Sequence, residues 1–229
     1  MSITGADGIT LNASNINTAD DTNPNISFTG AVTISGSVEV SSDNETNDGT
    51  IGFSSTIDGA GGTDNLTVLS GSGLPTFSGV IGDATALNNL SINATDTDSS
   101  NGATAALTIP TIGDSDGTPS AGANIVTIGS SDTASVTFGG DYYGTDGNFV
   151  VTATSGTDKI TFNGVSTTVT TSGDLVDLNS GVKLGNINTL TINTNTGNAL
   201  DSGGNVEIAG AIAGTSNENL TITTGNKGG

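Results

Sequence analysis

The sequence predicts an all-β fold, a right-handed parallel β-solenoid of about nine rungs, where a rung is one full turn of the coil of 22 to 25 residues. Three observations lead to this prediction: strand-like alternation, an internal repeat, and a composition poor in large apolar residues. Aromatic residues make up 3% of the 229 residues and hydrophobic residues 32%, while 35 residues are glycine. Such a chain is expected to bury a narrow interior rather than a thick globular core.

Strand-like alternation recurs along the chain. The segments AVTISGSVEV (31–40) and KITF (159–162) place apolar residues at every second position, the period of a strand with one buried face. By the same parity, Ile51, Phe53 and Ile57 are expected to point inward. Proline occurs only 4 times, which together with these alternating runs favours strands over disorder.

The internal repeat consists of a large apolar residue followed two positions later by a small one, at a step of about 24 residues. Five of the 6 phenylalanines occupy this position, which predicts an internal aromatic stack. LTIPTIG (107–113) is a degenerate copy inside the longest gap. The anchors are Phe28, Phe53, Phe77, Phe138, Phe162, Leu184 and Ile208.

A second column has two apolar residues around one threonine or serine, so Leu66 and Val68 are expected inside. Asn65 and Asn89 begin two copies and predict an asparagine ladder at a turn. The copies are NLTV (65–68), NLSI (89–92), TLTI (189–192) and NLTI (219–222).

We expect one domain over residues 1–229, since no segment has the composition of a linker. The step lengthens between about 93 and 137, where irregular rungs and protruding loops are predicted. An antiparallel β-sandwich is the alternative fold, because it also contains many short strands at regular spacing. It does not predict near-identical strings at a fixed period.

Charge and composition exclude several function classes. The chain has 23 acidic residues and three lysines, a net charge of -20, so we expect binding neither to nucleic acid nor to an anionic bilayer. Histidine and cysteine are absent, which removes imidazole bases, thiols, disulfides and the usual zinc ligands. No apolar run approaches the roughly 20 residues that a membrane span needs, so no membrane insertion is expected.

Acidic turns are the candidate metal sites, because oxygen-rich loops suit calcium, and no other cofactor is expected. Two Asp-x-Asp pairs lie on the predicted long loops. The segment GAGGTDNLTV is close to one RTX calcium repeat but lacks the tandem copies that this motif requires; a simple Gly-Asp turn is the alternative. The candidate calcium ligands are Asp96, Asp98, Asp114, Asp116 and Asp64.

The sequence offers little for catalysis, and no enzyme is expected. Paired carboxylates can hydrolyse glycosides, but such sites usually add arginine, histidine or aromatic platforms. Parity in DYYGTDGNFVV places Tyr142 inside and Tyr143 outside, which makes Tyr143 a candidate for stacking on sugars. A polysaccharide-acting enzyme is kept as an alternative function.

The strand repeats resemble those of large bacterial surface proteins. ISFTGAVTISGSVEV (26–40), GTIGFSSTIDG (49–59) and GNVEIAGAIAGTSNENLTITTG (204–225) are similar to repeats of filamentous-haemagglutinin-like exoproteins, autotransporter passengers and related giant adhesins. This resemblance implies an extracellular β-solenoid at the cell surface that serves as an adhesin, stalk or surface-layer component. It carries no catalytic residue to any position of this chain.

Structural self-assembly is therefore the expected function. The first and last residues have the pattern of ordinary rungs, so we expect either a segment of a longer solenoid or a subunit that stacks end to end into a stalk, fibre or surface layer. The expected partner is a second copy or a flanking solenoid. The alternative is an adhesin that binds surface glycans or a host surface through the loops at 93–137.

Overall fold

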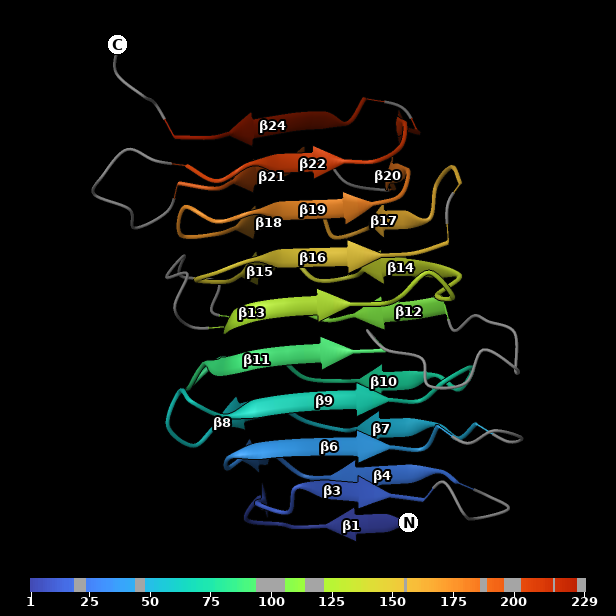
Figure 1. The fold of residues 1–229 in the computed structure, drawn as a ribbon, viewed down its shortest axis with the longest axis vertical. Coiled ribbons are helices and arrows are strands. Elements are labelled where there is room, and N and C mark those ends of the chain that lie inside the picture. The colour runs from blue at the N-terminus through green and yellow to red at the C-terminus, as the bar shows by residue number, and fades with distance from the viewer. Residues whose placement is uncertain are drawn as a thin grey trace.

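The computed structural model confirms the predicted class: the chain is an all-β parallel β-solenoid (Figure 1). All strand pairs are parallel and no helix occurs in the described part of the chain, so the antiparallel sandwich is excluded. The described residues are 1–18, 24–43, 48–93, 106–113, 122–154, 156–185, 189–195, 203–215 and 217–225.

The first face of the coil consists of two sheets that follow one another along the axis, with β10 beside β12. The 4-stranded sheet contains β1 (Ser2–Thr4), β4 (Ile26–Thr29), β7 (Ile51–Phe53) and β10 (Pro75–Phe77). The 5-stranded sheet contains β12 (Ala106–Ile109), β14 (Ser135–Phe138), β17 (Ile160–Phe162), β20 (Val182–Leu184) and β23 (Ile212–Gly214).

The second face begins with a 3-stranded sheet and ends with a 4-stranded one. Between them the ladder narrows to single parallel bridges that join Ile57, Ile81, Ile112 and Tyr143. The 3-stranded sheet contains β2 (Ile9–Leu11), β5 (Val32–Ile34) and β8 (Ile57–Gly59). The 4-stranded sheet contains β15 (Tyr142–Gly144), β18 (Ser166–Thr170), β21 (Thr189–Asn193) and β24 (Asn219–Thr223).

The third face is one continuous 8-stranded sheet, with each strand supplied by a separate rung. In Figure 1 its strands lie nearest the viewer and run to the right, those of the first face run to the left, and the chain climbs from the N-terminus at the bottom, so the coil is right-handed. Its strands are β3 (Asn15–Asn17), β6 (Ser37–Ser41), β9 (Asn65–Leu69), β11 (Leu87–Ile92), β13 (Ala123–Ile128), β16 (Phe149–Thr152), β19 (Val176–Asn179) and β22 (Val206–Ile208).

The predicted phenylalanine column lies inside the coil on the first face. Phe53 is stacked between Phe28 and Phe77, with ring centroids 4.8 and 5.5 Å apart. Phe138 stacks on Phe162 at 4.8 Å, and the degenerate copy is confirmed because Ile109 pairs with Phe138. In-register pairing thus brings residues distant in sequence into face-to-face contact, which stabilises the interior beyond simple burial.

The small residue two positions after each phenylalanine anchor lies at the corner between the first and second faces. A Cβ on Gly79 would lie 2.5 Å from the backbone carbonyl carbon of Ser55 in the preceding rung. Larger side chains therefore do not fit at Gly79, because the backbones of successive rungs approach closely there.

Two details of the predicted repeat are wrong. Ile208 is not in the anchor column: it lies in β22 on the third face and pairs with Leu178, while the residue beside Leu184 is Gly214. Rungs also vary beyond 22 to 25 residues outside the predicted irregular region, since 30 positions separate Val176 from its partner Val206. An apolar-x-apolar triplet fits any face of the coil, so the local pattern alone does not identify the face.

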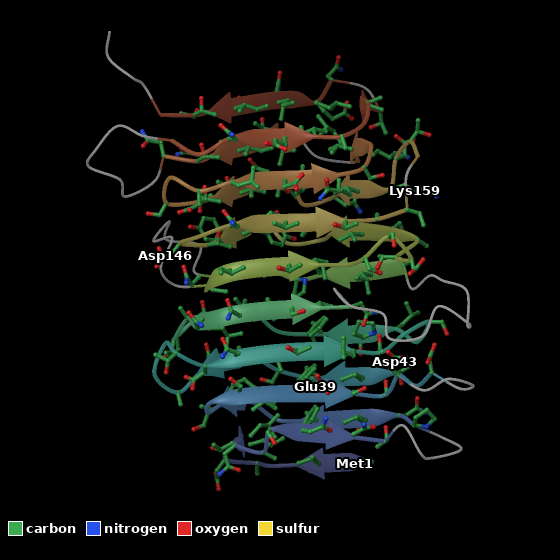
Figure 2. The ribbon with its side chains drawn as sticks, viewed as in Figure 1. Met1, Glu39, Asp43, Asp146 and Lys159 are labelled. Atoms are coloured by element: carbon green, nitrogen blue, oxygen red, sulfur yellow. The ribbon has the colours of Figure 1, made fainter. Side chains whose placement is uncertain are left out.

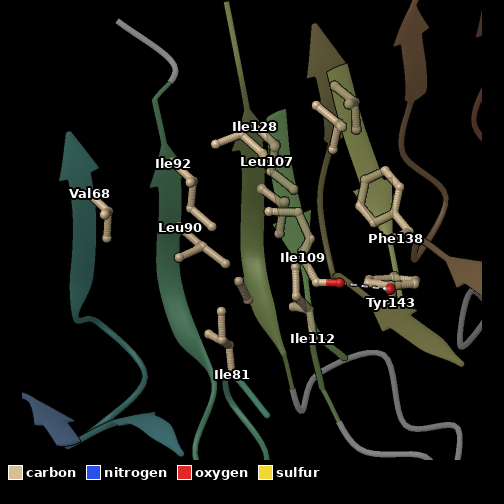
Figure 3. Close-up of a cluster of buried hydrophobic side chains, with 14 of the residues drawn as sticks. Val68, Ile81, Leu90, Ile92, Leu107, Ile109, Ile112, Ile128, Phe138 and Tyr143 are labelled. Carbon is tan, nitrogen blue, oxygen red and sulfur yellow. Dashed lines mark hydrogen bonds between the residues drawn. The ribbon is translucent and has the colours of Figure 1, made fainter. Parts of the chain in front are cut away.

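The second column divides between two faces. NLTV (65–68) and NLSI (89–92) pair with each other on the third face, whereas TLTI (189–192) and NLTI (219–222) pair on the second. The predicted parity is nevertheless right, because Leu66 and Val68 are completely buried. Figure 3 shows how such residues from successive rungs fill the interior.

The aromatic stack gives a direct test of the rung assignment. We expect Phe53→Ala to lower the free energy of unfolding by about 3–5 kcal/mol, because it removes a fully buried ring with contacts above and below. Thr67→Ala, on the outer surface of β9, should cost less than about 1 kcal/mol. Urea denaturation followed by circular dichroism measures both; similar midpoint shifts for the two variants would contradict the internal stack.

Candidate functional site

Asp64 is the only predicted calcium ligand among the described residues; Asp96, Asp98, Asp114 and Asp116 lie outside them. The Asp64 side chain is buried, and its carboxylate accepts hydrogen bonds from the N–H groups of Gly36, at 2.6 Å, and Gly61, at 2.7 Å. These bonds, that of Gly36 foremost, hold the pKa of Asp64 below its ordinary value although burial opposes them. Asp64 thus fastens a corner to the preceding rung, and calcium binding there stays a prediction.

The same kind of bond recurs at other corners. A carboxylate or amide oxygen of one rung accepts a backbone N–H of the next rung, 24 to 27 positions later. Each bond satisfies a donor that the short strands leave unpaired. The acceptor and donor pairs are Asn25 with Thr50, Asp48 with Ser72, Asp58 with Ala84, Asp141 with Val165, and Asn148 with Leu175.

The asparagine ladder is confirmed, although it lies at the start of third-face strands rather than within a turn. Asn89 donates through Nδ2 to Oδ1 of Asn65, at 2.8 Å, and Asn65 donates through Nδ2 to Oγ of Ser37, at 2.8 Å. Asn88 also donates to Asn65, at 2.9 Å. The ladder joins three successive rungs on their outer surface.

The tyrosine prediction is wrong, because Tyr143 points inward and is completely buried. Its hydroxyl donates to the Ile109 carbonyl, at 3.2 Å (Figure 3), and accepts the Gly140 N–H, at 2.7 Å. Burial raises the pKa of Tyr143 well above its ordinary value. Tyr142 is also buried, with its ring against Gly144, but it pairs with Thr168 on the outer side of the strand, so the predicted parity of the two tyrosines is inverted. The corner before β15 changes the phase of the inward and outward alternation, so parity counted from a neighbouring strand gives the wrong face. Neither tyrosine is exposed for sugar stacking.

Asp146 is the described carboxyl group with a raised pKa. It lies at a corner on the edge of the coil opposite Lys159 (Figure 2). Burial raises its pKa most, and the negative charge of Asp174 in the next rung adds to the shift. Two neighbouring carboxylates therefore repel each other across the rungs at neutral pH.

Both ends of the described coil have strand edges that pair with no further strand among the described residues. β22, β23 and β24 each pair on one side only, as do β1, β2 and β3. The interior is open at these edges: Ile212 is 46% exposed and Ile222 45%, whereas their partners one rung earlier, Val182 and Ile192, are buried. Sequence reasoning could not find this contrast, since all four residues fit the same pattern.

The described residues hold no group of three or more acidic side chains arranged to bind a metal ion. They also include no helix with the length and apolar character needed to cross a membrane. No protein-family model matches the chain, and no curated protein or solved structure shows significant similarity to it. Of what the resemblance to bacterial surface repeats implies, the structure shows the β-solenoid fold, and the comparisons add no support for a family.

The Asp64 corner predicts a pH-dependent loss of stability. Because the folded-state pKa is lowered, the Asp64 carboxylate stabilises the fold above its ordinary pKa of 3.8, and this stabilisation disappears as the pH falls through the folded-state value. We expect Asp64→Asn to cost about 1–3 kcal/mol at pH 7, because an amide cannot accept both hydrogen bonds as a carboxylate does.

Urea denaturation at pH 7 and pH 3 measures this effect, and the difference between wild type and Asp64→Asn should shrink at pH 3. Asp7→Asn, an exposed aspartate with the same charge change, is the control and should alter stability little. Equal effects of the two substitutions at pH 7 would argue against the corner bonds.

Ionisation of Asp146 has the opposite effect on stability to ionisation of Asp64. The folded-state pKa of Asp146 is raised, so its ionisation destabilises the fold as the pH rises above the ordinary value. We expect Asp146→Asn to increase stability at pH 7 by less than about 1 kcal/mol, since the group is partly exposed and screened. The gain should disappear at pH 3 in the same denaturation experiment. A loss of stability at pH 7 would contradict the repulsion with Asp174.

Proposed function

We propose that the chain is a structural repeat element of an extracellular, cell-surface stalk, fibre or layer, in which solenoids continue one another end to end. The proposal rests on a difference in side-chain exposure between the terminal rung and the rung before it, at equivalent positions of the second face. Ile222 occupies the position that Ile192 occupies one rung earlier, yet Ile222 is 45% exposed and Ile192 is buried. A further parallel rung over β22, β23 and β24 would remove this difference.

The energy of such a contact comes from two sources. Covering the exposed parts of Ile212 and Ile222 contributes roughly 1 kcal/mol each, because burying a whole aliphatic side chain contributes about 1.5–3 kcal/mol. The added rung also pairs the free N–H and C=O groups of three strands. In a solenoid, nearest-neighbour contacts of this kind supply most of the stability of each repeat.

Charge favours contact along the axis over contact between rods. With a net charge of -20, two parallel rods repel each other where they run side by side. An axial contact involves only the terminal rungs, and salt or divalent cations screen the remaining repulsion. The resemblance to haemagglutinin-like and autotransporter repeats is the basis for proposing a cell-surface location.

Electron microscopy and light scattering of the purified protein over a range of concentrations test this function. We expect rods that lengthen with protein concentration. Ile222→Asp should abolish the lengthening, because it places a charge at the rung edge. Leu74→Asp is the matched control, since Leu74 is also 45% exposed but belongs to neither terminal rung.

A second measurement tests the alternative in which the partner is a flanking part of a longer solenoid rather than a second copy. If the isolated chain stays short, a covalent tandem of two copies should still unfold at a higher urea concentration than one copy, because it contains one additional rung contact. Short particles combined with a tandem no more stable than a single copy would overturn the proposal. Repeating the scattering with calcium and with a chelator tests whether calcium assists assembly.

A further inference from the structure

A polar groove lies on the outer surface of the first face, over β14, β17 and β20. Its volume is about 320 Å³. Three of its residues, Thr137, Thr161 and Lys183, are register partners in successive rungs. The lining residues are Thr137, Thr161, Asn163, Lys183, Gly185 and Thr215.

Gly185 keeps this groove open. A Cβ at Gly185 would lie 2.6 Å from Oδ1 of Asn163 and 3.1 Å from the Phe162 carbonyl oxygen. Only a residue without a side chain therefore fits at this position of the groove. Successive rungs lie about 4.8 Å apart, so the two threonine hydroxyls and the lysine form a straight row along the axis. The row is fixed by backbone pairing rather than by a mobile loop.

Lys183 supplies the positive charge of this groove. The protein carries 23 acidic residues and three lysines, yet no acidic side chain in the described residues forms an ion pair with Lys183. Its side chain is half-buried, and its ammonium group has three donors and no acceptor. A cation in a partly buried position attracts an anion more strongly than a fully solvated one does.

We propose that this groove binds a carboxylate-bearing sugar, the uronate unit of an acidic polysaccharide. Lys183 pairs with the sugar carboxylate. The hydroxyls of Thr137 and Thr161 both donate and accept hydrogen bonds, which matches the hydroxyl groups of a sugar ring. The groove volume lies within the range of about 300–1,000 Å³ typical of small-ligand sites.

The chemistry favours a carboxylate over a sulfate or phosphate ester. The groove supplies a single ammonium rather than the planar fork of an arginine, which is the residue suited to bidentate anion recognition. The net charge of -20 also repels a ligand more strongly as its own charge rises. Glu218 accepts a hydrogen bond from the backbone N–H of the groove residue Thr215, at 3.0 Å.

Thr137, Thr161 and Lys183, on which this inference rests, lie in β14, β17 and β20, which pair on both sides, so only Thr215 of the groove belongs to a terminal rung. The groove gives the solenoid a ligand site on its side. The sequence could not indicate it, since Lys183 and Thr137 are 46 positions apart and become neighbours of Thr161 only through register.

Calorimetric titration with a galacturonate oligosaccharide, in buffer of about 0.15 M ionic strength, tests the site. At that ionic strength charges further away than about 8 Å are largely screened. We expect weak saturable binding by the wild type, and at least a tenfold loss with Lys183→Gln. Thr161→Val, which keeps the shape and removes one hydroxyl, should weaken binding about threefold.

Two controls make the test specific. Lys159→Gln changes the other described lysine, which does not line the groove, and should leave the affinity unchanged. The methyl ester of the same oligosaccharide has nearly the same shape without the charge and should bind at least tenfold more weakly. Circular dichroism of each variant confirms that the solenoid is folded.

Three results would overturn the proposal: no binding by the wild type, equal binding of the methyl ester, or unchanged binding by Lys183→Gln. Self-association of the wild type that is lost in Lys183→Gln, without saccharide binding, would instead assign the groove to contact with an acidic side chain of a second copy.

Discussion

In-register parallel pairing places each side chain about 4.8 Å from its equivalent in the next rung, and the rest of the structure depends on this constraint. A phenylalanine at one anchor must contact the residue at the next anchor, so the column holds rings that can stack, as Phe28, Phe53 and Phe77 do. The narrow interior explains how a chain with only 32% hydrophobic residues buries a continuous core.

The same constraint gives the acidic residues a structural role. Short strands leave backbone N–H groups unpaired at every corner, and a carboxylate or amide oxygen one rung away is at the right distance to accept them. Asp48, Asp58 and Asp141 act in this way toward the next rung, and Asp64 toward the preceding one. The negative charge also destabilises the fold by repulsion between neighbouring carboxylates, as between Asp146 and Asp174. Hydrogen bonds to carboxylates at other corners offset this repulsion.

Stacking also separates the molecule into surfaces with different chemistry. The terminal rungs expose apolar residues and free strand edges, which suit another rung of the same kind. The sides expose rows of small polar residues, because each outward position repeats along the axis, and one such row brings Thr137 and Thr161 beside Lys183. Assembly and ligand binding can therefore occupy different parts of one rod without competing.

The sequence by itself determined the solenoid, the inward parity of residues such as Leu66 and Phe53, and the anchors from Phe28 to Leu184, because period and alternation are local properties. Only the tertiary structure decided which face a strand joins: Ile208 belongs to the third face, and Tyr143 points inward. Corner and loop lengths reset the phase of the alternation, and a short apolar triplet fits any face equally well. For the same reason the groove at Lys183 and the open edge at Ile222 depend on register between rungs, which spacing along the chain does not specify.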